Sequence, residues 1–255
     1  MELSTVCDRL DDRLDHGDYA DVDASPNGLQ VGRADGRTVG HVAFAVDGVE
    51  ATAAAAAEAG ADLLVVHHGM IWGGLDRVTG REYGRVAALV ERDLPLYVSH
   101  LPLDGHDEFG NAARLAEFLG CEVTGPFGRL GGVSIGQRAR AAEPYTVAGL
   151  RDRLSSLATG GKPVDVLDFG TDRIEDVAVV TGGGADWVRE AAETGVDAFV
   201  TGEGKQKVYH EAREAGLNVF LAGHYATETF GVQALESLVA DWGLETTFLE
   251  HPTGL

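Results

Sequence analysis

The sequence has 255 residues, 44% of them hydrophobic, which is enough for one large domain or two smaller ones with packed cores. Its 41 acidic residues outnumber its 20 basic ones, and the formal net charge of −21 is spread along the chain, so we expect neither nucleic acid nor anionic lipid as a partner. No apolar run approaches the roughly 20 residues that span a bilayer, and the acidic N-terminus does not resemble a signal peptide. We therefore expect a cytoplasmic protein that does not enter membranes, in a cell whose concentrated salt screens this charge.

The sequence contains two cysteines, Cys7 and Cys121. Two cysteines are too few for a disulfide framework, and they are not spaced as the ligands of a zinc knuckle are. We predict that both are buried free thiols.

Hydrophobic patterning in the first half predicts an alternation of helices and strands. The predicted elements are a helix over Leu3–His16, a loop over Ser25–Gly32, a strand over His41–Val46, a helix over Ala51–Ala59 and a strand over Asp62–Val66. A strand, a helix of about ten residues and a second strand are typical of a βαβ unit with parallel strands.

The second half repeats this pattern. Strands are predicted over Asp176–Thr181 and Asp197–Thr201, with a helix over Ala185–Thr194 between them. The two stretches align without a gap at an offset of 176 − 41 = 135 residues, and pairs such as Asp62 with Asp197 are identical. Two unrelated βαβ units could converge on similar glycine and alanine positions, but the ungapped length favours a duplication.

The repeat continues through a further helix and strand in each half. These are Tyr83–Arg92 with Leu94–Val98, and Gln206–Ala215 with Leu217–Leu221. The fold class is therefore predicted as α/β, with two similar α/β halves related by internal duplication. A glycine-rich stretch near Gly125–Gly136 predicts the boundary, which gives domains 1–125 and 126–255. Residues 141–165 and 236–247 are assigned to the second half.

Three polar motifs follow predicted strands, where open α/β folds place their functional sites. They are His67-His68-Gly69, the segment from His100 to Asp104, and the segment from His224 to Glu228. Imidazole and carboxylate donors together suit zinc, iron, manganese or nickel. A carboxylate has two oxygens and can bridge two ions.

Each motif also has a structural interpretation. Adjacent histidines are often not ligands, and a histidine or carboxylate can simply stabilise the start of a helix. Because all three motifs lie at equivalent strand ends of a duplicated fold, we favour a dinuclear metal site between the two halves. The predicted ligands are His67, His68, Asp104, His224 and Glu228. The other histidines are predicted to be solvated (His16, His251), structural (His41) or weaker candidates (His106, His210).

The repeat also predicts an asymmetry between the halves. His67 and His68 align with Gly202 and Glu203, so Glu203 is a candidate ligand or supporting group. His100 corresponds to His224, which makes it either a ligand or a proton-relay residue, and we favour the relay. His100 and Glu203 are thus the predicted catalytic residues, moving protons beside the metals or supporting the ligands.

Together these motifs resemble the Nif-three-like dinuclear metal centre family, whose members are often labelled GTP cyclohydrolase I type 2 homologs. The resemblance is carried, in order along nearly the whole chain, by SPNGLQVG (Ser25–Gly32), VHHGMIW (Val66–Trp72), SHLPLD (Ser99–Asp104) with GN (Gly110-Asn111), TGE (Thr201–Glu203) and AGHYATE (Ala222–Glu228). It implies two similar α/β domains, a ring-shaped homohexamer with metal sites facing an inner cavity, and the five ligands named above, with Glu228 shared by both ions.

The chain departs from this family in two places. It has no room for the extra domain that many bacterial relatives insert between the halves. The stretch Gly204–His210 is longer than in some relatives, so no role is assumed for Lys205 or His210.

Two bound divalent ions would suit hydrolysis, because such a pair activates water and holds an oxygen-rich substrate. The family label implies a nucleotide, GTP, as the substrate. Gly182-Gly183-Gly184 could hold a phosphate or be a plain strand-to-helix turn, and Trp72, Phe109 and Tyr225 could stack on a base or pack in the core. The alternative function is a non-catalytic metal carrier or a regulatory scaffold.

Overall fold

The structure is a computed structural model that describes residues 1–34 and 36–255. The chain forms two compact units. The first comprises Met1–Leu103 with Gly231–His251, and the second comprises Asp104–Phe230 with Pro252–Leu255. These ranges differ from the predicted 1–125 and 126–255, because the chain leaves the first unit early and returns to it near the C-terminus.

The first unit is built on a five-stranded sheet of order β1-β4-β3-β2-β11, in which only β1 is antiparallel to its neighbour. Its strands are β1 (Gly28–Val31), β2 (His41–Asp47), β3 (Leu63–His68), β4 (Leu96–Val98) and β11 (Glu245–Phe248). Its helices are α1 (Leu3–Leu14), α2 (His16–Tyr19), α3 (Glu50–Glu58), α4 (Gly80–Val90) and α11 (Thr229–Asp241), and α5 (Leu101–Gly105) leads out of it.

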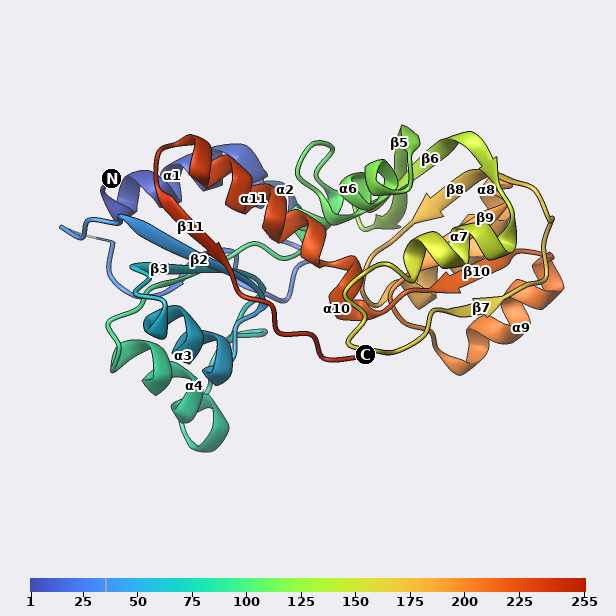
Figure 1. Ribbon diagram of the computed structural model, residues 1–255. Coiled ribbons are helices and arrows are strands. Elements are labelled where there is room, and N and C mark those ends of the chain that lie inside the picture. Colours follow the sequence, from blue (N-terminus) through green and yellow to red (C-terminus); the bar gives the residue numbers. More distant parts are fainter. Residues whose placement is uncertain (35) are drawn as a thin grey trace. The chain divides into compact units, whose positions relative to one another are not determined.

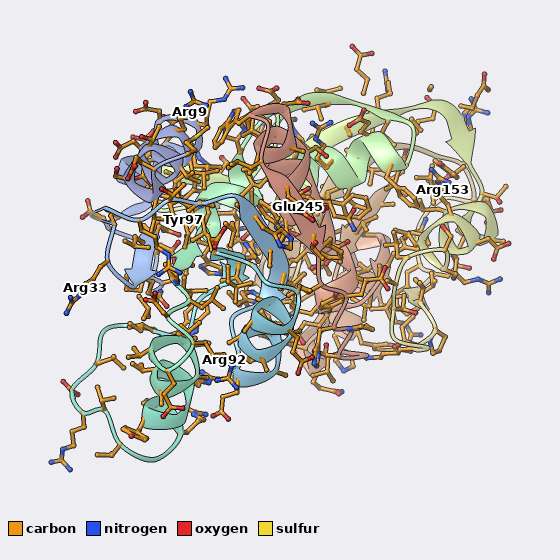
Figure 2. The ribbon with its side chains drawn as sticks, turned by 60° about the vertical axis from the view of Figure 1, so that its left-hand side comes forward. Arg9, Arg33, Arg92, Tyr97, Arg153 and Glu245 are labelled. Atoms are coloured by element: carbon orange, nitrogen blue, oxygen red, sulfur yellow. The ribbon has the colours of Figure 1, made fainter. Side chains whose placement is uncertain are left out.

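Helices cover both faces of this sheet, with α3 and α4 on one face and α1 and α11 on the other (Figure 1). The residues of β3 from Leu63 to Val66 are all fully buried, which explains their continuous apolar run. On the α1 face the buried Tyr97 lies beneath the helix, and its hydroxyl donates to Asp11 Oδ1 at 2.6 Å (Figure 2).

The second unit contains a six-stranded sheet of order β5-β6-β8-β9-β10-β7. Its strands are β5 (Cys121–Leu130), β6 (Val133–Tyr145), β7 (Asp165–Leu167), β8 (Ile174–Val179), β9 (Ala198–Thr201) and β10 (Asn218–Leu221). Its helices are α6 (Asn111–Phe118), α7 (Val147–Leu154), the 3₁₀ turn η1 (Gly184–Trp187), α8 (Val188–Thr194), α9 (Gln206–Ala215) and α10 (His224–Thr227). Helices α6 and α7 cover one face, and α8 and α9 cover the other (Figure 1).

Both units share one arrangement of strands. The parallel strands β2, β3 and β4 have the order and direction of β8, β9 and β10, and an antiparallel edge strand borders the third strand in each unit. The register is also shared, because Val42 pairs with Leu63 and Val177 pairs with Ala198, each residue displaced by 135. A duplicated unit would produce this match.

Two predicted assignments of segments are wrong. Gly125–Gly136 lies within the β5–β6 hairpin of the second sheet, whose burial alternates along β6 as expected for antiparallel strands. The stretch 236–247 does not close the second half, since β11 pairs in parallel with β2 of the first sheet. Local patterning cannot reveal such pairings between residues far apart in sequence.

The two cysteines are buried and free, as predicted. Burial, followed by the carboxylates of Asp11 and Asp8, raises the pKa of Cys7 to about 11, and burial alone raises the pKa of Cys121 to about 11. Both thiols therefore stay protonated near neutral pH. Within the described part of the chain, none of the helices has the length and apolarity needed to cross a bilayer.

Candidate metal centre

Three histidine side chains come together at the carboxyl ends of β3 and β4 in the first unit. His67 and His68 end β3, and His100 follows β4. Each offers a ring nitrogen, and these nitrogens lie within 4.8 Å of one another. The ring centroids of His67 and His68 are 4.6 Å apart, and those of His67 and His100 are 5.1 Å apart. Such a cluster of imidazoles is a candidate metal-binding group.

Hydrogen bonds fix the orientation of all three rings. The Nδ1 of His67 lies 3.0 Å from the Ser99 carbonyl oxygen. The Nδ1 of His68 lies 2.9 Å from Asp47 Oδ1, and that of His100 lies 2.8 Å from Asp23 Oδ1. Since carbonyl and carboxylate oxygens only accept, each Nδ1 donates, which leaves Nε2 as the nitrogen available to a ligand or metal in the neutral ring. This is how histidine ligands of metals are usually held.

The segment Ser25–Gln30, which includes the start of β1, supports this cluster. Gln30 Oε1 accepts hydrogen bonds from the amides of Met70 and Ile71, directly after the paired histidines. A Cβ on Gly69 would lie 2.5 Å from the amide end of the Gln30 side chain, so any larger residue here would displace that amide. The Asn27 Oδ1 accepts from the His100 amide at 2.7 Å. The SPNGLQ segment therefore holds the ends of both strands in place.

Asp23 is the centre of this support, with only 1% of its side chain exposed. Besides the His100 ring, its carboxylate accepts from the amide of Ser25 and from the Leu101 amide. Burial alone would raise the pKa of Asp23, but the hydrogen bonds from His100 and its neighbours outweigh burial and lower it. The carboxylate thus stays ionised and keeps the His100 ring oriented.

Replacing Asp23 with asparagine should destabilise the first unit and misorient His100. The amide has one acceptor oxygen where the carboxylate has two, so a buried donor loses its acceptor at a cost of about 1–3 kcal/mol. Chemical denaturation at neutral pH should show this loss. Because the pKa of Asp23 is lowered, its stabilisation is present above the ordinary pKa and disappears as pH falls through the lowered one, so the difference should shrink in acid.

The exposed Asp21 provides the matched control. Asp21→Asn should leave the free energy of unfolding within about 0.5 kcal/mol of the unchanged protein. Equal effects of the two substitutions would show that Asp23 does not have the structural role assigned to it.

Two carboxylate side chains and one histidine lie close together in the second unit. Asp104, 6% exposed, accepts from Asn111 Nδ2 at 2.9 Å and Thr181 Oγ1 at 3.0 Å, both on Oδ1. Glu228, 3% exposed, offers an oxygen within 4.8 Å of one from Asp104. Its Oε2 lies 3.2 Å from His224 Nε2. Asp104, His224 and Glu228 therefore gather in this unit, although Asp104 was predicted to belong to the first half.

His224 lies between two carboxylates, since Glu203 Oε1 is 3.2 Å from its Nδ1. Burial alone would lower the pKa of His224, but the hydrogen bonds and charges of Glu228 and Glu203 raise it to about 9. Without a cation, the imidazolium balances the two acids at neutral pH. A bound divalent ion would take over that role and displace a proton.

Gly182 allows the loop after β8 to approach these side chains. A Cβ at this position would lie 1.9 Å from Glu228 Oε1 and 2.8 Å from His224 Nε2, and its φ of +56° also favours glycine. The Gly182 amide donates to Thr227 Oγ1 at 3.0 Å. This glycine therefore belongs to the wall of the site.

Gly182→Ala should displace Glu228 and reduce the metal content of the protein, because no side chain fits against that carboxylate. We expect a destabilisation of about 1–3 kcal/mol together with loss of metal, measured by denaturation and elemental analysis. The neighbouring Gly183 has a φ of −83° and its Cβ would meet nothing closer than 3.6 Å. Gly183→Ala should therefore keep both stability and metal, and a loss as large as that of Gly182→Ala would contradict this explanation.

His100 and His224 do not occupy the same backbone position in the repeat. Val66 pairs with Val98, and Thr201 pairs with Leu221, so β4 and β10 correspond at an offset of 221 − 98 = 123. His100 then matches Gly223, one residue before His224. The two histidines also have different neighbours. Asp23 lies beside His100, whereas two glutamates lie beside His224.

The remaining histidine predictions have mixed outcomes. The prediction that His16 is solvated is wrong, since its side chain is 15% exposed and lies 3.2 Å from Ser99 Oγ. His41 is structural as predicted, bonded to Thr247 of β11. His106 Nδ1 accepts hydrogen bonds from the backbone amides of Glu108 and Phe109 in its own loop.

The three aromatic residues beside the motifs differ in their exposure to solvent. Phe109 and Tyr225 are buried, whereas Trp72 is 43% exposed and meets the His100 ring edge-on.

Sequence patterning missed three residues that orient side chains of the candidate site. These are Asp23, Asp47 and Thr181. Asp47 and Thr181 follow the same rule that found the histidines, since both stand at or just after the carboxyl end of a parallel strand. Asp23 lies in an irregular segment, where no periodicity marks it.

The sequence profile of the Duf34/NIF3 family (NGG1p interacting factor 3) matches residues 1–253. The chain belongs to this family. Similar family members include a protein of Halobacterium salinarum named "GTP cyclohydrolase 1 type 2 homolog", 59% identical over 100% of both chains. The resemblance expected from the motifs is thereby confirmed.

Solved structures that are similar to this chain have the same fold. One titled "protein ybgI, unknown function" has a TM-score of 0.90 and 33% identity over 100% of both chains. The protein TTHA1606 from Thermus thermophilus has a TM-score of 0.87 and 39% identity, again over 100% of both chains. The mixed α/β class with two sheets is therefore shared with experimentally solved relatives.

Proposed function

We propose that this Duf34/NIF3 protein is a metal-dependent hydrolase that acts on a nucleotide or a related substrate and holds two divalent ions per chain. The proposed ligands are His67, His68, Asp104, His224 and Glu228, with Glu228 shared by both ions. The observation that carries the proposal is the clustering of the histidines at the end of β3 and β4, each with its Nδ1 held by an acceptor.

The donor chemistry fits divalent transition metals. The set combines neutral imidazole nitrogens with carboxylate oxygens and contains no thiolate, which suits zinc, iron, manganese or nickel. Asp47 beside His68, and Thr181 with Asn111 beside Asp104, are the outer hydrogen-bond partners that metal ligands usually have.

When bound, a pair of such ions lowers the pKa of water and neutralises charge that develops on a substrate oxygen. The protein's own contribution is orientation and proton transfer. His100 presents Nε2 while Asp23 holds Nδ1, so this pair can take a proton at Nε2 and stabilise the resulting imidazolium. Glu203, with a side chain 49% exposed, can receive or return a proton at the solvent side of His224.

Support for a nucleotide substrate comes from relatives. Several curated family members, from Halobacterium salinarum to Archaeoglobus fulgidus, carry the name "GTP cyclohydrolase 1 type 2 homolog". Ring opening of a purine nucleotide by water is a hydrolysis, the class of reaction that the donor set favours.

Turnover of a panel of nucleotides and phosphoesters by metal-reconstituted protein tests the proposal. Activity that is lost in the His67→Ala, Glu228→Ala double variant is the expected result. Activity that is unchanged in this variant would refute the catalytic role of the site. His100→Ala should keep the metals yet lose turnover, whereas loss of metal would identify His100 as a ligand.

The rival function is metal storage or delivery, or a scaffold for other proteins. Its distinguishing outcome is stoichiometric metal binding without turnover of any substrate in the panel. We also propose a homohexamer, as the resemblance implies, and light scattering of the intact protein would measure its mass.

A further inference from the structure

A cavity beside Glu203 has the features of a ligand-binding subsite. It lies within the second unit, next to the carboxyl ends of β9 and β10 and the first turn of α9. Its volume is about 350 Å³, within the range of small-molecule sites. The side chains that matter for the argument are Lys162, Asp165, Glu203, Lys205 and Tyr209.

The charge of this cavity stands out from the rest of the chain. The protein has a formal net charge of −21 and only three lysines, Lys162, Lys205 and Lys207, and the first two of these line the cavity. Lys205 pairs with Asp186 at 2.5 Å, but both side chains are at least half exposed, so the pair is weak and can exchange partners. Two primary amines at one cavity can bind the oxygens of a phosphate group.

Tyr209 adds an aromatic surface to the same cavity. Tyr209 is 41% exposed, so part of its ring is open to solvent. The Phe169 ring holds it in a T-shaped contact, with centroids 5.3 Å apart and planes at 89°. A ring that is fixed at its side and open to solvent can stack on a planar base.

Two carboxylates complete the lining. Asp165 and Glu203 can accept hydrogen bonds from the N–H groups of a heterocycle. Glu203 also contacts His224, so the cavity borders the candidate metal centre within this unit. Amines, carboxylates and an aromatic ring together match a ligand that carries a phosphate, N–H donors and a flat ring.

We propose that this cavity binds a single nucleotide, with its phosphates at Lys162 and Lys205 and its base against Tyr209. This inference rests on the proposed function, since it assigns that site a substrate-binding region. The ligand is a mononucleotide and not a nucleic acid strand, because a long polyanion would be repelled by the strongly acidic surface.

Equilibrium binding of GTP, GDP, guanosine and inorganic triphosphate to the full-length protein tests this assignment. Calorimetry on metal-loaded and on chelator-treated protein would measure the affinity for each ligand. Affinity should fall from GTP to GDP to guanosine, and triphosphate without a base should bind more weakly than GTP. Lys162→Ala and Lys205→Ala should each weaken GTP binding about tenfold without changing the affinity for guanosine.

Tyr209→Ala should weaken both GTP and guanosine about tenfold, and Tyr209→Phe should restore the binding of both. Lys207→Ala is the matched control, because Lys207 pairs with the same Asp186 but does not line the cavity. It should bind GTP as the unchanged protein does.

Equal GTP affinity in the Lys162, Lys205 and Lys207 variants would overturn the proposal. Triphosphate binding as tightly as GTP, with no effect of Tyr209→Ala, would also overturn it, since the cavity would then recognise phosphate alone. Failure of the proposed function has a different signature: GTP binds in a manner that depends on Lys162 and Tyr209, yet metal-loaded protein turns over no substrate. GTP turnover that is unaffected by substitution of Lys162 and Tyr209 would refute the proposed subsite but would support the proposed hydrolase function.

Discussion

The His67→Ala protein is expected to bind at most one divalent ion per chain, against the two proposed for the unchanged protein. His67 is fully buried and its ring is fixed by the Ser99 carbonyl, so alanine removes a donor that is already oriented. Loss of an outer hydrogen-bond partner already weakens metal binding by about 10–100-fold, and loss of a direct ligand should exceed that. Elemental analysis after reconstitution and gel filtration would measure the change.

His41→Ala is the control for this substitution. His41 stands at the opposite end of β2 and bonds to Thr247, away from the ends of the strands that carry the cluster. This variant should retain two ions. His67→Gln keeps more of the side-chain volume, so metal loss in both His67 variants with intact unfolding transitions would separate a ligand effect from a folding defect. Two ions bound to His67→Ala would refute its assignment as a ligand.

Metal uptake is expected to release protons and to strengthen as pH rises toward about 9. In the metal-free protein the pKa of His224 is raised to about 9, so its ring is an imidazolium at neutral pH and must lose a proton before it can ligate. Coupling to one proton changes the apparent affinity by about tenfold per pH unit below that pKa. Calorimetry in buffers of different ionisation enthalpy would count the protons released.

The stability of the metal-free protein should change in the opposite direction. A histidine whose pKa is raised from 6.5 to about 9 on folding stabilises the folded state fully below pH 6.5, and this contribution is lost as pH rises through about 9. Glu203→Gln removes one of the two carboxylates that raise the pKa of His224, so proton release should move to lower pH. An unchanged pH dependence in Glu203→Gln would contradict this account.

The parts of the fold that depend on local sequence were predictable. The continuous apolar run of β3, the alanine-rich helix α3 and the residues at the ends of parallel strands were all visible in the pattern. Helix α1 was predicted to end at His16 but stops at Leu14, because Asp15 adopts a φ of +47°. Such a change of direction in a single residue leaves little trace in hydrophobic periodicity.

Long-range pairing and polar support were not predictable in the same way. The partner of β11 is β2, which is about 200 residues earlier, and nothing in the composition of Glu245–Phe248 identifies it. Asp23 likewise depends on a distant histidine, since it lies 77 residues before His100 in sequence. The strand-end rule that found the histidines also applies to Asp47 and Thr181, but it does not apply to Asp23, which lies in an irregular segment.

The placement of β11 bears on the order in which the chain can fold during synthesis. The second unit draws all but its last four residues from one continuous stretch, Asp104–Phe230, and that stretch leaves the ribosome before Gly231–His251. Until Gly231–His251 emerges, β2 is paired with β3 on one side, and its other edge, which β11 later covers, is unpaired. The N-terminal sheet is therefore completed last. Nascent or truncated chains that end before Glu245 would carry that open edge, which makes them the species most prone to self-association and to capture by chaperones.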